Sequence, residues 1–201
     1  MLQPEPIDES KIIVTDDFLP EKDFAIVRDY ILGHQMSWYW VGNYAGGYPL
    51  MEHVFYSEKR GPELHVGTPM VNTTAFRAID PVIARLQPAS LIRVRANCNW
   101  RTDDKMQQRD WHTDVPFACQ SGIYYMHDSD GCTVFRDGTN EQIEVETKEN
   151  RLIQFPSTYE HAATPFTEGV RRVVLNINFH INKIIPNVTT ITTGISNPEH
   201  W

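Results

Sequence analysis

The chain has 201 residues, of which 41% are hydrophobic and 22% charged, and its formal net charge is −8. This length and composition are typical of one globular domain with its own core. The acidic balance disfavours binding to nucleic-acid backbones, which requires clustered cations. The sequence shows no secretory signal and no apolar run long enough for a membrane span, so we expect a cytoplasmic protein. Free thiols are expected at Cys98, Cys119 and Cys132.

The N-terminal part is predicted to mix strands and helices. Residues 11–19 are typical of a short strand that breaks at Pro20, and helical spacing of apolar residues predicts a helix over about 21–33. The aromatic-rich segment 37–57 predicts strand, loop and strand, with its aromatic side chains packed in the core. The polar segment 58–68 predicts a loop that could cover a site.

A second helix is expected to begin at Asp80 as N-cap, with Pro81 at its first position. From Ser90 onward, short β-rich runs alternate with turn residues, and the segment 127–131 between two of them predicts a hairpin turn. The runs are 91–100, 121–128, 131–138, 141–146, 151–156 and 170–181.

These elements predict a single domain over 1–201. It comprises a helical and aromatic support over about 1–89, a β core over about 90–185 and a tail over 186–201. The expected fold class is mainly β, with N-terminal helices backing an antiparallel double-layer sheet.

A candidate metal site is formed by His112, Asp114 and His161. Alternate residues of an extended strand point to the same face, so His112 and Asp114 can converge on one ion, and His161 from another strand can complete the set. Two imidazoles and one carboxylate are the ligands of non-haem Fe(II) sites with open coordination positions. The pattern is short, and the histidines elsewhere in the chain show that the residue type alone does not define a site.

An arginine ten residues after His161 provides a candidate anchor for an acidic cosubstrate. Two arginines, Arg171 and Arg172, are adjacent, and strand alternation is used to choose between them. Arg171 shares its face with Val173 and Leu175, an apolar face that should point inward. An inward arginine needs a partner, which a dicarboxylate can supply. The prediction is therefore Arg171.

Together these segments resemble the Fe(II)- and 2-oxoglutarate-dependent dioxygenase superfamily, in particular its short prolyl-4-hydroxylase-like branch from phages and bacteria. The resemblance covers about residues 90–182. It rests on the segments 111–114, 123–126, 131–135, 151–155, 161–165 and 169–171, in the order in which the family uses them.

The resemblance implies a double-stranded β-helix, or jelly roll, with iron bound by His112, Asp114 and His161. It also implies that Arg171 binds the distal carboxylate of 2-oxoglutarate, that the Tyr125 hydroxyl shares this carboxylate, and that O2 is consumed. Asn97 and Asn99 are candidates for a further cosubstrate contact, or for polar residues without a role in the site. The carboxylate Asp114, present where halogenating relatives have a small residue, favours hydroxylation.

The expected activity is hydroxylation of a C–H bond in a protein residue of the prolyl type or in a small metabolite, with release of succinate and CO2. An alkylated base is disfavoured by the acidic balance, and neither a nucleic-acid nor a membrane partner is expected. Glu160 could orient a histidine ring or be a solvated carboxylate. The alternatives are a cupin-like metal-dependent enzyme or binding protein that does not use 2-oxoglutarate, and a structural jelly roll. The oligomeric state is left open.

Overall fold

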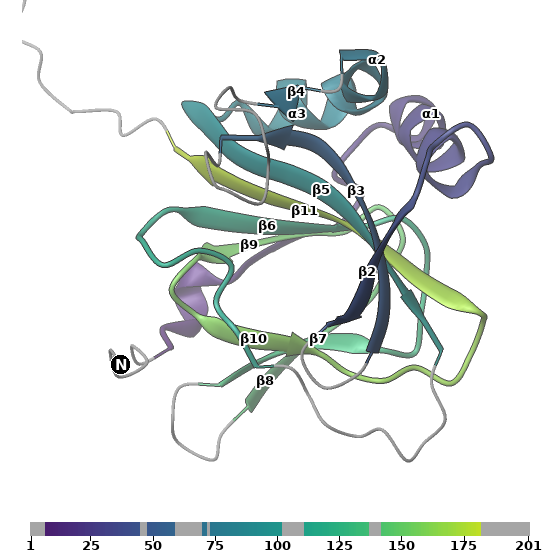
Figure 1. The fold of residues 1–201 in the computed structure, drawn as a ribbon. Helices are drawn as coiled ribbons and strands as arrows, with labels where there is room; N and C mark the ends of the chain where they lie inside the picture. Colours follow the sequence, from purple (N-terminus) through teal and green to yellow (C-terminus); the bar gives the residue numbers. More distant parts are fainter. Residues whose placement is uncertain are drawn as a thin grey trace, which may run out of the picture.

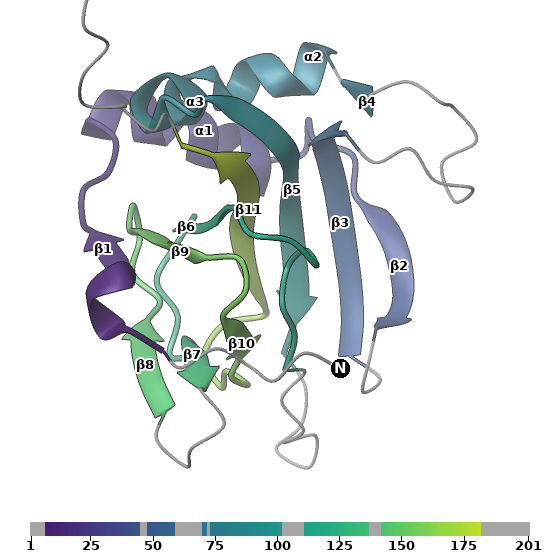
Figure 2. The same ribbon diagram turned by 90° about the vertical axis from the view of Figure 1, so that its left-hand side faces the viewer.

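The computed structural model describes residues 7–44, 48–58, 70–71, 73–101, 111–136 and 142–181. Two antiparallel β-sheets face each other in it, and helices cover the outer side of the larger sheet (Figures 1 and 2). The predicted double-layer β arrangement with flanking helices is therefore confirmed. The expected loop over 58–68, apart from Glu58, and the expected tail over 186–201 lie outside the described residues.

The larger sheet contains eight strands, and the smaller sheet three. In spatial order the larger sheet is β1 (Ile13–Thr15), β9 (Leu152–Pro156), β6 (Gln120–Tyr125), β11 (Arg171–His180), β5 (Ser90–Trp100), β3 (Tyr48–Ser57) and β2 (Tyr39–Tyr44), with β4 (Met70–Val71) paired to β3. The smaller sheet is β10 (Glu160–Ala163), β7 (Cys132–Arg136) and β8 (Gln142–Glu146). From residue 90 onward the chain passes repeatedly from one sheet to the other, which is the winding of a double-stranded β-helix.

The helices belong to the N-terminal part of the chain. They are the 3-10 helix η1 (Glu9–Lys11), α1 (Glu21–Leu32), α2 (Thr73–Phe76), η2 (Arg77–Ile79) and α3 (Asp80–Leu86). The predicted helix over 21–33 is thus confirmed. The N-cap of α3 is Ile79, so Asp80 lies inside the helix and the prediction of an Asp80 cap is wrong. In the part of the chain that the structure describes, no helix has both the length and the apolar character needed to cross a bilayer.

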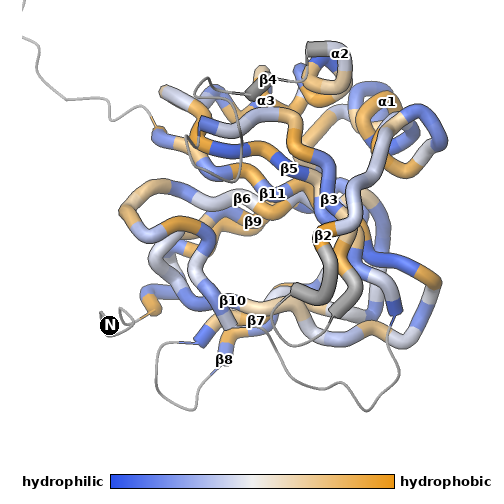
Figure 3. The backbone as a smooth tube through the Cα atoms, viewed as in Figure 1, coloured by the Kyte–Doolittle hydropathy of each residue, from blue (hydrophilic) through white to orange (hydrophobic). Residues whose placement is uncertain are grey.

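Both faces of the central strands of the larger sheet, β5 and β11, are covered, and the two faces have different chemistry. On β5 and β11 hydrophobic residues alternate with hydrophilic ones (Figure 3). The apolar set, including Val94, Ala96 and Leu175, packs with Phe24 and Val27 of α1 in one core. The opposite set faces the space between the two sheets. Burial of the apolar face under the helices is what leaves a polar wall facing the smaller sheet.

Two details of the sequence prediction are wrong. The segment 127–131 is not a hairpin turn, because β6 and β7, which it connects, belong to different sheets. Its Asp130 carboxylate accepts hydrogen bonds from the backbone N–H groups of Thr167 and Glu168, at 2.8 and 3.0 Å. The aromatic residues of 37–57 do not all pack in the core either, since Tyr39 and Trp40 are each 61% exposed.

The three cysteines are free thiols in the structure, as predicted. The buried Cys98 lies on the helix-facing side of β5, in the same core as Val94 and Ala96.

Candidate metal and cosubstrate site

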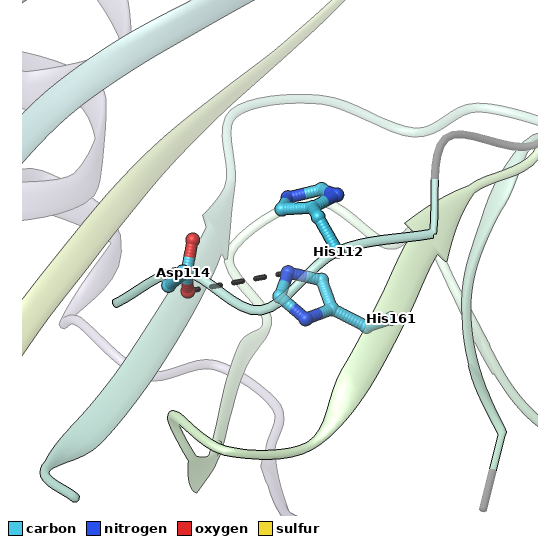
Figure 4. Close-up of side chains that lie close together, drawn as sticks. All are labelled: His112, Asp114 and His161. Atoms are coloured by element: carbon cyan, nitrogen blue, oxygen red, sulfur yellow. Dashed lines mark ion pairs between the residues drawn. The ribbon is translucent and has the colours of Figure 1, made fainter. Parts of the chain in front are cut away.

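The three predicted metal ligands come together at the edge of the smaller sheet. His112 and His161 form an isolated antiparallel bridge, in which each backbone N–H donates to the other residue's carbonyl, at 3.1 and 3.0 Å. Asp114 follows in a bend rather than on an extended strand. One ligand atom from each side chain lies within 4.8 Å of the others, and Figure 4 shows the three side chains turned toward one another.

One oxygen of the Asp114 carboxylate accepts a hydrogen bond from the protein, and the other has no hydrogen-bond partner among the described residues. Its Oδ1 accepts a hydrogen bond from Asn176 Nδ2 at 3.1 Å and lies 3.5 Å from Arg93 Nη2. Its Oδ2 is buried, has no hydrogen-bond partner among the described residues and lies 4.0 Å from His161 Nε2. Buried oxygens are rarely left without a partner, so this arrangement fits a bound cation.

The charges of these groups also suit a metal. Burial by itself raises the pKa of Asp114, but the nearby His161, Ser121 and Arg93 outweigh burial and lower that pKa to about 2. Burial lowers the pKa of His161, so its ring is neutral near pH 7. An ionised carboxylate beside a neutral imidazole is the protonation state that metal coordination requires.

The ring of His161 is oriented by the backbone. Its Nδ1 lies 3.1 Å from the Tyr159 carbonyl oxygen, which can only accept, so Nδ1 carries the proton and Nε2 keeps its lone pair. Glu160 turns away, because its Oε2 accepts a hydrogen bond from Arg136 Nε at 2.9 Å. Of the two interpretations of Glu160, the structure therefore favours the one in which it does not orient a histidine ring.

A cavity of about 140 Å³ opens between the two sheets beside the histidines. Polar side chains of β5 and β11 form one wall, and β7 and β10 form the other. The polar residues that line it are Arg95, Asn97, Asn99, His112, Thr133, His161, Thr164, Arg172 and Asn176.

The structure places Arg172 in this cavity and Arg171 outside it. Arg172 is 5% exposed and lines the cavity, whereas Arg171 donates from Nη2 to the Leu32 carbonyl at the end of α1, at 2.8 Å. The choice of Arg171 assumed that the apolar face of β11 points into the barrel, and the structure contradicts that assumption. That face packs under the helices, and the polar face of Arg172 and Asn176 points into the cavity.

Arg172 is a buried cation held by neutral groups. Its Nε donates to Thr147 Oγ1 at 3.0 Å and its Nη2 to Thr133 Oγ1 at 3.1 Å. Its Cζ lies 5.5 Å from the centre of the Tyr125 ring. Among the described residues no carboxylate forms an ion pair with it. Because a buried charge without a counter-charge is costly, the site fits an anionic ligand.

Of the remaining predicted residues, Tyr125 and Asn99 lie beside Arg172, and Asn97 lies opposite Val174. The Tyr125 hydroxyl donates to Thr133 Oγ1 at 2.8 Å, and burial raises its pKa, so it stays a neutral donor. Tyr125 is buried below Arg172 and does not line the cavity, whereas Asn97 and Asn99 do. Sequence reasoning gave no role to Thr133, although it lies in one of the segments that carried the resemblance.

Comparisons with solved structures agree with this architecture. A 2OG-Fe(II) oxygenase family oxidoreductase from Burkholderia pseudomallei matches with a TM-score of 0.62 at 12% identity, over 86% of each chain. The chain has the fold of the 2OG-Fe(II) oxygenases. The prediction of a double-stranded β-helix is therefore confirmed, as is the resemblance at the level of fold. No protein-family model and no curated protein matches the sequence.

Other structures with this fold bind different molecules. A prolyl hydroxylase from Trichoplax adhaerens, solved with a hypoxia-inducible-factor peptide fragment, matches with a TM-score of 0.55 at 15% identity, over 84% of this chain and 83% of that one. The epimerase SnoN, solved with Fe3+, α-ketoglutarate and nogalamycin RO, matches with a TM-score of 0.56 at 10% identity, over 85% and 79%. The fold thus accommodates both a peptide and a small molecule.

Proposed function

We propose that this protein is an Fe(II)- and 2-oxoglutarate-dependent dioxygenase that hydroxylates a C–H bond. His112, Asp114 and His161 would hold the iron, which supplies activation of O2 when bound. Arg172, in place of the predicted Arg171, would bind the distal carboxylate of 2-oxoglutarate.

The observation that carries this proposal is one cavity lined both by the two histidines of a two-histidine, one-carboxylate cluster and by a buried arginine without a carboxylate partner among the described residues. A cupin-like metal protein that does not use 2-oxoglutarate would need the cluster but not Arg172. A structural jelly roll would need neither.

The chain's own residues would divide the binding between two ends of the cavity. Arg172 and Asn176 face it from the same strand, four residues apart, a separation of about 13 Å. Asn176 fixes Asp114 at the metal end, and Thr133 and Thr147 fix the guanidinium of Arg172 at the other. Tyr125 supports Arg172 through Thr133. Asn99 lies opposite Arg172 on the neighbouring strand β5 and lines the same cavity wall.

In the overall reaction one atom of O2 enters the substrate C–H bond to give C–OH, and the other enters succinate. The C1 carboxylate of 2-oxoglutarate leaves as CO2, and this decarboxylation supplies the two electrons that the reduction of O2 needs beyond those of the C–H bond. The substrate classes predicted from the sequence are a protein residue of the prolyl type and a small metabolite.

Succinate formation tests the proposal. The purified protein is incubated with Fe(II), 2-oxoglutarate and O2, and succinate is measured for wild type and for His161→Ala. We expect slow succinate release by wild type even without substrate, and none by the variant. Calorimetry of Zn(II) binding gives an independent readout, in which His161→Ala should lose the high-affinity site. Absence of both Zn(II) and 2-oxoglutarate binding in wild type would contradict the proposal.

A further inference from the structure

A second charged group lies on the wall of the cavity, separate from Arg172. The inner face of β5 carries Arg93, Arg95, Asn97 and Asn99 at alternate positions. Arg93 is used by the metal site, since it contacts Asp114 and donates to Asn178 Oδ1 at 3.0 Å. Arg95 lines the cavity together with Asn97 and Asn99, and it has no part in the proposed binding of the metal or of 2-oxoglutarate.

Three buried atoms of the cavity wall formed by β5 and β11 lack a hydrogen-bond partner among the described residues: Arg95 Nε, Asn97 Oδ1 and Asn176 Oδ1. Asn176 already donates to Asp114, and the other two atoms belong to β5. The unpaired Asp114 Oδ2 belongs to the candidate metal cluster, whereas the donor Arg95 Nε and the acceptor Asn97 Oδ1 lie on residues outside it. Buried unpaired polar atoms are rare and costly, so a ligand with a matching acceptor and donor is the simplest partner.

Glu52 adds a negative charge beside Arg95. It lies on β3 directly across from Asn97, and its Oε2 is 3.4 Å from Arg95 Nη1. The two side chains are 26% and 15% exposed. Because Nη1 faces Glu52, the Nε side of the guanidinium remains for another anion, and a carboxylate binds such an edge with two parallel hydrogen bonds. Glu52 and Asn97 Oδ1 are adjacent acceptors for a cation.

The register of the sheet separates this group from the cosubstrate anchor. Arg172 lies opposite Asn99, whereas Arg95 lies opposite Asn176, the residue that holds Asp114. Arg95 is therefore at the metal end of the cavity. Since Arg172 is the proposed cation for the distal carboxylate of 2-oxoglutarate, Arg95 is available to bind the substrate.

We propose, on the basis of the dioxygenase function above, that the substrate is a free α-amino acid. Arg95 binds its carboxylate, and Glu52 with Asn97 Oδ1 binds its ammonium group. An internal residue of a peptide has neither charge at its backbone, and an alkylated base has no carboxylate, so neither satisfies the paired charges of this wall. The side chain of the amino acid then extends toward the metal ligands, where the C–H bond is hydroxylated.

The test begins with the wild-type protein and a set of probes. Succinate formation is measured with each free proteinogenic L-amino acid, with its methyl ester, which lacks the carboxylate charge, and with its des-amino acid, which lacks the ammonium group. We expect at least one free amino acid to raise succinate formation about tenfold or more and to gain oxygen by mass spectrometry. Its ester and its des-amino acid should each bind about 10- to 100-fold more weakly, the loss of one charge-assisted pair.

Two variants link the probes to the residues. Arg95→Gln should weaken binding of the free amino acid about 10- to 100-fold and hardly affect binding of the ester. Glu52→Gln should weaken binding of the free amino acid similarly and hardly affect the des-amino acid. Binding is measured by calorimetry on protein loaded with Zn(II) and 2-oxoglutarate, and Arg85→Gln, at an exposed position of α3, is the matched control.

The outcomes separate this inference from the proposed function. If wild type neither binds 2-oxoglutarate nor forms succinate, the dioxygenase function fails and the substrate inference fails with it. If succinate forms but no free amino acid increases it, or if esters or a prolyl peptide act as well, only the substrate inference is overturned. A loss of 2-oxoglutarate affinity in Arg95→Gln as large as that in Arg172→Met would assign Arg95 to the cosubstrate and also overturn it.

Discussion

Asn176 donates a hydrogen bond from Nδ2 to Asp114 Oδ1 at 3.1 Å, across the space between β11 and the bend that follows His112. This contact decides which carboxylate oxygen is available to a metal. With Oδ1 bound to Asn176 and near Arg93, Oδ2 is the oxygen that faces His161 Nε2 at 4.0 Å. Asn176 is thus a positioning residue for the metal ligand Asp114.

Replacing Asn176 should weaken metal binding. We expect Asn176→Leu to lower Zn(II) and Fe(II) affinity about 10- to 100-fold, because residues that orient a metal ligand have effects of that size. Calorimetric titration measures the affinity, and thermal unfolding of the metal-free protein shows whether the fold is retained. Unchanged Zn(II) affinity in a folded variant would contradict the positioning role of Asn176.

The adjacent arginines of β11 should behave differently. Arg172→Met removes the proposed anchor and should lower 2-oxoglutarate affinity about 10- to 100-fold, the effect of losing a charge-assisted hydrogen-bonded pair. Without its ligand the buried guanidinium has no counter-charge among the described residues, so the variant's unfolding temperature should be equal to or above that of wild type.

Arg171→Met is the matched control. It removes a hydrogen bond to the Leu32 carbonyl on the helix side of the sheet and should leave 2-oxoglutarate affinity unchanged. Both affinities are measured by calorimetry with Zn(II) bound. If Arg171→Met lost the affinity and Arg172→Met kept it, the placement of the anchor would be wrong.

The contrast between these two arginines shows what the sequence could predict. The alternation of hydrophobic and polar residues over 91–100 and 170–181 predicts the two strands correctly, because successive side chains of a strand point to opposite faces of its sheet. Alternation also separates Arg171 from Arg172 onto opposite faces. It does not tell which face is inside the barrel, because both faces of these two strands are buried, one under α1 and α3 and the other facing the smaller sheet. That choice depends on tertiary packing.

Short-range patterns failed where pairing partners are distant. The sequence placed His161 on a strand but gave that strand no bounds, since the four residues of β10, Glu160–Ala163, include two alanines and show no clear alternation. It is a strand because it pairs with β7 and bridges to His112. The polar wall of Arg95, Asn97 and Glu52 likewise depends on the alignment of β3 with β5, more than 40 residues apart in sequence.

Arg136 joins the residues that precede the two histidines. Its Nε donates to Glu160 Oε2 at 2.9 Å, and its Cζ lies 4.4 Å from the centre of the Trp111 ring. Glu160 precedes His161 and Trp111 precedes His112. Arg136 therefore helps to hold the two histidine ligands in position from outside the cavity. We expect Arg136→Gln to lower Zn(II) affinity about fivefold, equivalent to about 1 kcal/mol for a partly exposed ion pair with a cation–π contact.

The matched control for the positioning role of Arg136 is Arg101→Gln, which removes an exposed arginine that donates to the Thr167 carbonyl. Arg136→Lys should restore part of the affinity, because it keeps the charge but not the planar group that lies over the indole. The positioning role of Arg136 is disproved if Arg136→Gln lowers the unfolding temperature of the metal-free protein while Zn(II) affinity stays at the wild-type value.

Asp16 provides a test of pH dependence away from the site. It follows β1 and accepts from Arg151 Nε at 2.6 Å and Nη2 at 3.1 Å, and from Lys148 Nζ at 2.9 Å. The hydrogen bonds of Arg151 and Lys148 hold the pKa of Asp16 well below its ordinary value of 3.8. A carboxyl with a lowered folded-state pKa stabilises the fold fully above its unfolded-state pKa and loses this contribution as the pH falls toward the folded-state value.

We therefore expect Asp16→Asn to lower the unfolding temperature by about 2–4 °C near pH 7, corresponding to about 1 kcal/mol for a partly exposed ion pair. The difference from wild type should shrink as the pH is lowered from about 5 to about 2, because Asp16 itself becomes protonated in the unfolded state. Asp17→Asn removes an equal charge from the exposed neighbour and serves as control. Thermal unfolding across this pH range measures the effect, and a difference that grows toward low pH would contradict the ion-pair account.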